Sequence, residues 1–138
     1  MTPTEQRCTP QIELAELADR IIDELERADV VVIGAPIYNF GVPRCIKAWT
    51  DLAVRAGRIF AYTESGPQGL VTGKPVYIAS ASGGAPTGSG ADFATPHLTW
   101  FLAFLGFTDI TMINAGALML DPTKAEQAET QTRQLASV

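Results

Sequence analysis

Two aromatic side chains and an amide stand together directly after an apolar run of the sequence. Segment 35–43 carries Tyr38, Asn39 and Phe40, and it follows the β-branched run 30–33. A strand that ends in such a turn, with a helix after it, places flat side chains and free backbone N–H groups at the carboxyl end of a sheet. Ligands bind at that edge in open α/β sheets. We therefore predict that residues 35–43 form a ligand-binding loop.

A second candidate loop follows the next predicted strand. Segment 81–90 is rich in glycine, and Gly83 and Gly84 allow a ligand to approach the backbone closely because neither residue has a Cβ. Successive parallel strands end at the same edge of a sheet. We therefore predict that segments 35–43 and 81–90 line one shared pocket.

Helical and strand patterns alternate along the chain, and these elements must position the two loops. The run 30–33 lacks polar residues, which predicts a strand covered by helices on both faces. A first helix is predicted from Thr9 and Pro10 onward, with an apolar stripe of Leu14, Leu17, Ala18, Ile21 and Leu25. The remaining expected elements are a helix at 43–55, a long functional loop at 57–73, a strand at 75–81, a helix from about 95, a strand at 109–114 and a helix at 124–135.

This alternation predicts an α/β fold with a doubly wound parallel sheet, in a single domain over residues 1–138. The 46% of hydrophobic residues suffice for one core, and a net charge of −5 argues against nucleic-acid binding. Two cysteines are too few for a disulfide framework, which favours a reduced, cytoplasmic setting. No apolar run approaches the length of a membrane span, so we expect no membrane partner.

The ordered residues along the chain resemble a known family. The segment Pro36-Ile37-Tyr38-Asn39-Phe40-Gly41-Val42-Pro43, with Lys47-Ala48-Trp49 and Asp51 after it, resembles the flavin-binding segment of the flavodoxin-like NAD(P)H quinone oxidoreductases. Within that family it is most similar to the FMN-dependent NADH azoreductases of bacteria. Later matches include Arg55-Ala56-Gly57, Gly66-Pro67, Ser82-Gly83-Gly84, Asp92 and Phe104-Leu105-Gly106, and the resemblance extends from about residue 17 to residue 117.

The resemblance implies a flavodoxin-like three-layer α/β/α fold, a homodimer, and FMN held between the two loops. NADH or NADPH would reduce the flavin, and a quinone or azo compound would then take the electrons in a ping-pong reaction without a catalytic side chain or a metal. The implied cofactor-binding residues are Pro36, Ile37, Tyr38, Asn39, Phe40, Ala81, Ser82, Gly83 and Gly84. The implied substrate-lining residues are Phe60, Tyr62 and Phe104, which the partner chain could contribute.

These residues also have simpler structural interpretations. Tyr38 and Phe40 could cap the core, the glycine pair could be a flexible loop, and Phe104 lies on an apolar helical face where core packing is usual. His97 is the sole histidine. We interpret it as partly buried packing rather than as an acid or base, because hydride transfer to a flavin needs no histidine.

The sequence departs from the family pattern at its start. We find no strand with a phosphate-binding loop before the first helix, so we expect the first βαβ unit of the family to be missing and the strand at 30–33 to be an exposed edge. A second hypothesis is therefore a truncated, catalytically impaired fragment that acts at most as a weak flavin-binding or assembly module. A third is a one-electron flavodoxin carrier, which the long loop at 57–73 disfavours.

Overall fold

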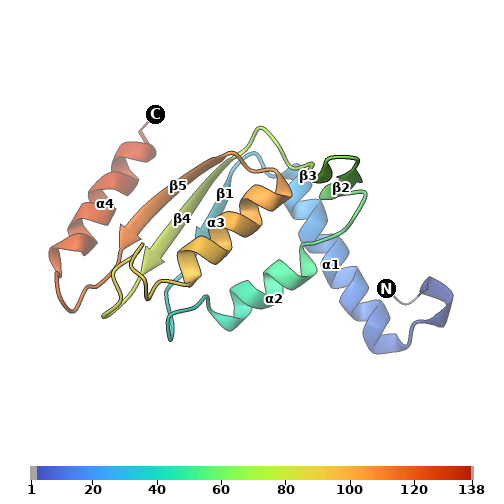
Figure 1. Ribbon diagram of the computed structural model, residues 1–138, viewed down its shortest axis with the longest axis horizontal. Coiled ribbons are helices and arrows are strands. Elements are labelled where there is room, and N and C mark those ends of the chain that lie inside the picture. Colours follow the sequence, from blue (N-terminus) through green and yellow to red (C-terminus); the bar gives the residue numbers. More distant parts are fainter. Residues whose placement is uncertain (1–2, 138) are drawn as a thin grey trace.

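The structure, a computed structural model, describes residues 3–137 and shows a layered α/β arrangement (Figure 1). Its helices are the short 3-10 helix η1 (Thr4–Gln6), α1 (Thr9–Arg27), α2 (Arg44–Leu52), α3 (Ala94–Leu105) and α4 (Thr123–Leu135). Its strands are β1 (Val31–Gly34), β2 (Phe60–Thr63), β3 (Gly66–Gly69), β4 (Pro75–Ala81) and β5 (Asp109–Ala115). The predicted alternation of helices and strands is confirmed, and β4 has the predicted bounds.

The central sheet is parallel, with the strand order β1-β4-β5. Val32 lies beside Tyr77 of β4, and Ser80 of β4 lies beside Asn114 of β5. Helix α2 connects β1 to β4 by way of the segment 53–74, and α3 connects β4 to β5. Both helices lie on the same side of the sheet (Figure 1). All three strands therefore end at one edge, as the sequence predicts.

The hydrophobic core lies between this side of the sheet and helices α1 to α3. Fully or nearly fully buried side chains come from each of these layers: Ile22, Leu25, Ile33, Val76, Ile78, Leu98, Leu102 and Leu105. The predicted stripe of α1 is only partly correct, because Leu14 and Leu17 are exposed and Ile22 is buried in their place. Only the second half of α1 reaches the sheet. Its last carbonyls accept hydrogen bonds from the Lys74 ammonium, which satisfies groups that a helix end leaves unpaired.

The other face of β1 is open, so the prediction of a strand covered on both faces is wrong. Val32 is 72% exposed, whereas its neighbour Ile33 is buried in the core. The reason is that, among the described residues, only α4 packs away from the other helices, and it packs against β5 rather than β1 (Figure 1). No residue of α4 is fully buried. Separately, the order β1-β4-β5 puts β1 at an edge of the sheet, as the sequence predicts.

The segment predicted as a loop at 57–73 contains an antiparallel hairpin instead. Strands β2 and β3 pair from Phe60 opposite Gly69 to Thr63 opposite Gly66, and Gly66 adopts a left-handed φ of 112° at the turn. The sequence did not predict this hairpin, because the segment is rich in glycine and proline, which usually indicate loops. Gly69 packs directly on the end of α3, where a Cβ would lie 2.2 Å from the Gly106 nitrogen. The hairpin is therefore fixed against α3.

Candidate functional site

The loop after β1 closes in a tight two-residue turn. The Tyr38 N–H donates to the Gly41 carbonyl and the Gly41 N–H donates to the Tyr38 carbonyl, each over 3.1 Å. The two central residues, Asn39 and Phe40, have φ values of 48° and 70°. Positive φ at both positions is the geometry of a type I′ turn. Asparagine suits the first position, and glycine is the usual residue at the second.

Phe40 is therefore held in a backbone conformation that aromatic residues rarely adopt. Such strain persists where the surrounding structure determines it, and it concentrates at functional sites. The strain is not relieved by burial, because the Phe40 side chain is 56% exposed and that of Tyr38 is also exposed. The alternative interpretation of both aromatics as caps of the core thus finds no support. The turn presents two aromatic surfaces to the space outside the sheet edge.

Backbone hydrogen bonds join this turn to the second predicted loop. The Ile37 N–H donates to the Ala81 carbonyl over 2.8 Å, which continues the pairing of β1 with β4 beyond the strand ends. On the other side of the turn, the Phe93 N–H donates to the Phe40 carbonyl over 3.0 Å. The structure therefore brings segments 36–40 and 81–84 side by side. Their roles in cofactor binding stay predictions.

The glycine pair after β4 borders open space. A Cβ on Gly84 would meet no atom within 4 Å, and a Cβ on Gly83 would meet only the Met119 side chain, with its sulfur at 3.2 Å. Neither residue has the left-handed φ that requires glycine. The packing of the chain itself thus gives no reason for glycine at position 84. A ligand that lies against the backbone there would give one.

A third loop, which the sequence patterns did not predict, closes the same edge. It follows β5, and its Leu118 and Met119 N–H groups donate to the carbonyls of Ser82 and Gly83 over 3.0 and 2.9 Å. The Ala117 N–H donates to the Ser82 hydroxyl over 2.8 Å. Met119 itself is 82% exposed. The adjacent apolar residues Leu118-Met119-Leu120 after a strand were the available signal, and they place an exposed apolar side chain next to Gly83.

Asp92 anchors the glycine-rich loop to the start of α3. One of its carboxylate oxygens accepts the Gly88 N–H over 2.8 Å, and the other accepts the Thr95 N–H over 2.9 Å. Burial by itself raises the pKa of this carboxyl, but the hydrogen bonds to its charged form have the larger combined effect. The pKa of Asp92 therefore lies below its ordinary value. An ionised Asp92 thus helps to fix the loop that carries Gly83 and Gly84.

The three predicted substrate-lining residues form a cluster of their own. The rings of Phe60 and Phe104 lie 5.0 Å apart, those of Phe60 and Tyr62 lie 5.2 Å apart, and Trp100 stacks on Phe104 at 6.0 Å. This cluster joins the β2–β3 hairpin to the end of α3, whereas the loops after β1 and β4 lie near the start of α3 (Figure 1). Within one chain, the cluster and the loops are therefore at opposite ends of the helix.

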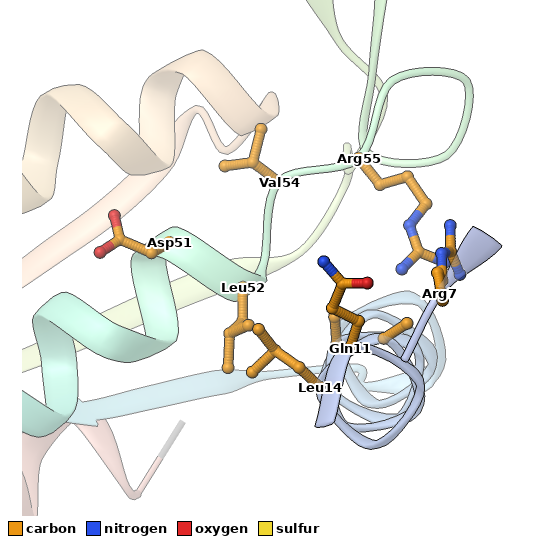
Figure 2. A pocket seen from close by; sticks show the side chains of 9 residues that line it. Arg7, Gln11, Leu14, Asp51, Leu52, Val54 and Arg55 are labelled. Atoms are coloured by element: carbon orange, nitrogen blue, oxygen red, sulfur yellow. The ribbon is translucent and has the colours of Figure 1, made fainter. Parts of the chain in front are cut away.

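A cavity lies elsewhere in the structure, away from both predicted loops. It has a volume of about 440 Å³ and lies between the first half of α1 and the end of α2, with Leu14 and Leu52 on its walls (Figure 2). Arg55, at its rim, forms an ion pair with Asp19 of α1. Neither predicted loop lines this cavity, so it is not the site that the sequence predicts.

His97 is exposed on α3, which corrects the prediction of partly buried packing. Across residues 3–137, no three potential ligands from His, Cys, Asp and Glu come together in a way that could hold a metal ion. The same residues contain no helix that is both long and apolar enough to cross a membrane.

A comparison of the sequence with known families shows which family the chain belongs to. The sequence pattern of a family described by its flavodoxin-like fold matches residues 2–138. The chain belongs to this family. Among its relatives, the FMN-dependent NADH:quinone oxidoreductase 1 of Jannaschia sp. (strain CCS1) is 49% identical over 137 residues, which cover 99% of this chain and 72% of the relative. The FMN-dependent NADH:quinone oxidoreductase of Burkholderia thailandensis is 48% identical and covers 96% of this chain and 67% of the relative.

Solved structures agree with this family. An FMN-dependent NADH-azoreductase from Bacillus anthracis str. Ames Ancestor, in complex with FMN, superposes with a TM-score of 0.85 at 27% identity, over 96% of this chain and 66% of that one. An azoreductase from Bacillus anthracis str. Sterne gives a TM-score of 0.78 at 28% identity, over 90% of this chain and 61% of that one. The fold is therefore flavodoxin-like, and the chain spans less than two thirds of these two structures.

Replacing Phe40 should reveal the strain of the turn. We expect Phe40→Gly to be more stable to urea than Phe40→Ala by about 1 kcal/mol, because only glycine adopts this positive φ without a steric penalty. The order is opposite to that in regular strands and helices, where alanine is the more stable. The two variants lack the aromatic ring equally, so their difference isolates the backbone term. Equal stabilities would contradict a strained Phe40.

Acid should weaken the anchor at Asp92. Its folded pKa is lowered, so its stabilisation is complete above the unfolded pKa of about 3.9 and is lost as the pH falls through the folded value. We expect Asp92→Ala to lower the free energy of unfolding by about 1–3 kcal/mol at pH 7, and the difference from the wild type to shrink below pH 4. Urea titrations at pH 7 and pH 3 measure this difference. The exposed Glu13→Gln is the control, and a pH-independent deficit of Asp92→Ala would contradict the assignment.

Proposed function

We propose that this protein is an FMN-dependent NADH:quinone oxidoreductase that also accepts azo compounds. The observation that carries the proposal is the open space at Gly84, beside a turn that holds Tyr38 and Phe40 outward. A relative that is 49% identical over 99% of the chain is named for this activity, and an azoreductase of the same fold is named as a complex with FMN. Together these features support a flavin site at the carboxyl edge of the sheet.

The residues of this edge fit a flavin ring. Isoalloxazine is flat and largely apolar, so it needs an aromatic or aliphatic surface on its faces and hydrogen-bond donors at its rim. Tyr38 and Phe40 supply exposed ring surfaces, and the absence of a Cβ at Gly84 leaves the backbone accessible to the rim. Asn39 adds an exposed side-chain amide at the centre of the turn. Met119 offers a further apolar surface beside Gly83.

In this proposal the residues of the chain orient the flavin, and no side chain takes part in the reaction itself. When bound, FMN supplies hydride transfer between NADH and the acceptor, which we propose to follow each other at the site in ping-pong order. The turn 38–41 would orient the ring, because its two hydrogen bonds and its link to Phe93 restrict movement of Tyr38 and Phe40. Asp92 keeps the glycine-rich loop in place from the other side. The aromatic and methionine side chains would exclude water from the reacting centre.

A homodimer would complete this site. Phe60, Tyr62 and Phe104 lie at the far end of α3 from the loops, so in one chain they do not face the turn. Tyr62 is 77% exposed, and Trp100, which stacks on Phe104 in the same cluster, is 72% exposed, so the cluster forms an aromatic patch of the kind found at protein interfaces. We propose that this patch packs on a second copy and reaches the partner's loops. The two free cysteines fit a cytoplasmic location.

A substitution at Gly84 tests the flavin site. We expect the wild-type protein to bind FMN and NADH to bleach the bound flavin. Gly84→Leu should weaken FMN binding at least tenfold, about 1.4 kcal/mol, while leaving thermal stability unchanged, because its side chain enters space that the protein leaves open. Gly90→Leu is the matched control, since a Cβ there also meets no atom within 4 Å. Equal FMN affinity of the two variants, or a wild type that binds no FMN, would contradict the proposal.

A charge in the aromatic patch tests the dimer. We expect Tyr62→Glu to shift the protein towards the monomer in sedimentation velocity, because an interface with an unpaired buried carboxylate is strongly weakened. Leu14→Glu is the control, because Leu14 is also exposed and apolar but lies on α1. It should leave the sedimentation coefficient unchanged. A wild type that sediments as a monomer at all concentrations, or a Tyr62→Glu protein that remains dimeric, would rule out this interface.

A further inference from the structure

The cavity between α1 and α2 has the size and the walls of a small-molecule site. Its volume of about 440 Å³ is within the range of roughly 300–1,000 Å³ that ligand pockets usually have. Its apolar lining comes from α1, α2 and the segment after α2, and every member is aliphatic: Leu14, Ala15, Ala18, Leu52 and Val54. Leu14 is 54% exposed, so a ligand there would cover apolar surface that now faces water. Walls of this kind favour a saturated hydrocarbon over a flat ring, which binds best against aromatic side chains.

Gln11 directs hydrogen-bond donors into the cavity. Its side-chain oxygen accepts the Cys8 N–H over 3.1 Å, a bond that belongs to the cap at the start of α1. Because this bond holds the oxygen on the side of Cys8, the amide nitrogen lies on the other side. Figure 2 shows that nitrogen directed towards Leu52, on the opposite wall of the cavity. An NH2 group donates hydrogen bonds and cannot accept them, so Gln11 selects an acceptor.

Arg55 places a positive charge at the same part of the cavity. Its Nη1 donates to Asp19 of α1, and this ion pair holds a side chain that is only 25% exposed. A guanidinium has several N–H donors in a planar fork, and the bond to Asp19 engages one nitrogen of that fork. The fork matches the two oxygens of a carboxylate. Arg7 lines this end of the cavity as well (Figure 2). The polar end is therefore suited to an anion.

Asp51 is the acidic residue of the lining, but it does not oppose an anion at the arginine end. Figure 2 shows Asp51 on the far side of Leu52 from the two arginines. Its carboxylate forms an ion pair with Lys47 one helical turn earlier, which neutralises its charge locally. The cavity thus has a cationic, donor-rich end and an aliphatic body.

We propose that this cavity binds a small monocarboxylate with a saturated hydrocarbon body. The carboxylate accepts hydrogen bonds from the Gln11 amide and the Arg55 guanidinium, and the hydrocarbon lies against Leu14, Ala18 and Leu52. Neither proposed flavin loop lines the cavity. The site is therefore distinct from the flavin site, and its occupation requires neither FMN nor NADH.

Two probes of equal chain length separate the contribution of the charge from that of the hydrocarbon. We expect octanoate to bind at least tenfold more tightly than 1-octanol, and acetate, which lacks the hydrocarbon body, not to bind measurably. Amide chemical shifts in NMR titrations of the full chain measure the affinities and locate the ligand. The largest changes should fall at residues 11–18 and 52–55. Equal affinities for octanoate and 1-octanol, or the largest changes at 36–40 and 81–84, would overturn the proposal.

Gln11→Glu tests the donor without removing the cap. A carboxylate at this position can still accept the Cys8 N–H, but it replaces the NH2 group by an oxygen that repels the ligand. We expect octanoate binding to weaken at least tenfold and 1-octanol binding to stay unchanged. The control is Gln127→Glu, which makes the same change of charge on α4, far from the cavity. Octanoate affinity that is equal in the two variants would contradict the assignment of Gln11.

The two arginines that pair with Asp19 provide a second matched test. Arg55 lines the cavity and Arg58 does not, although both form ion pairs with Asp19 and their side chains are 25% and 32% exposed. Arg55→Gln should abolish the preference for octanoate over 1-octanol, whereas Arg58→Gln should retain it. Equal effects of the two substitutions would show that a general loss of charge is responsible, and would overturn the proposal.

The oligomeric state and the flavin site are tested separately. Octanoate affinity that falls as the protein concentration rises would assign the cavity to a contact between copies of the chain, against the proposal. Gly84→Leu, the variant designed to weaken FMN binding, should bind octanoate as the wild type does. Failure of the flavin proposal would therefore leave this result unchanged.

Discussion

Pairing of β4 on both of its sides is the interaction on which the rest of the structure depends. This strand is joined to β1 through four residue pairs and to β5 through seven. Because all three strands run in the same direction, their following loops have to emerge at one edge. The pairing does not stop at the strand ends, since Ile37 still bonds to Ala81 and Leu118 and Met119 bond to the loop after β4. The candidate site is thus an extension of the sheet, built mostly from backbone hydrogen bonds.

The sequence predicted the elements whose signals are local. β4 contains the strand-forming residues Val76, Tyr77 and Ile78, and its predicted and observed bounds agree. The ligand loops followed from their position after strands, so the order of elements along the chain was enough to place segments 36–40 and 81–84 together. The hairpin at 60–69 was missed because its second strand, β3, consists of glycine, proline and glutamine, and only pairing with β2 makes this segment a strand. Nor could local patterns show that Val32 lacks a covering helix, because burial is decided by distant elements.

The loop around Met119 illustrates a different limit. Its three apolar residues at 118–120 are only a weak signal, and its place in the site depends on hydrogen bonds to Ser82 and Gly83, more than thirty positions earlier in the chain. The strain at Phe40 is likewise invisible in the sequence. A turn of Asn39 and Phe40 becomes left-handed at both residues only because β1 and the start of α3 fix its two ends. Features of this kind follow from tertiary contacts rather than from residue preference.

Helix α3 is a rigid spacer that backbone contacts hold at both ends. At its start, Phe93 is bonded to the strained turn, and at its end, Val71 bonds to Leu105 while Gly69 touches Gly106 backbone to backbone. Twelve helical residues span about 18 Å, and neither fastening leaves room for sliding. A displacement of the turn would therefore move helix α3 as a rigid body, and with it the aromatic patch near its end.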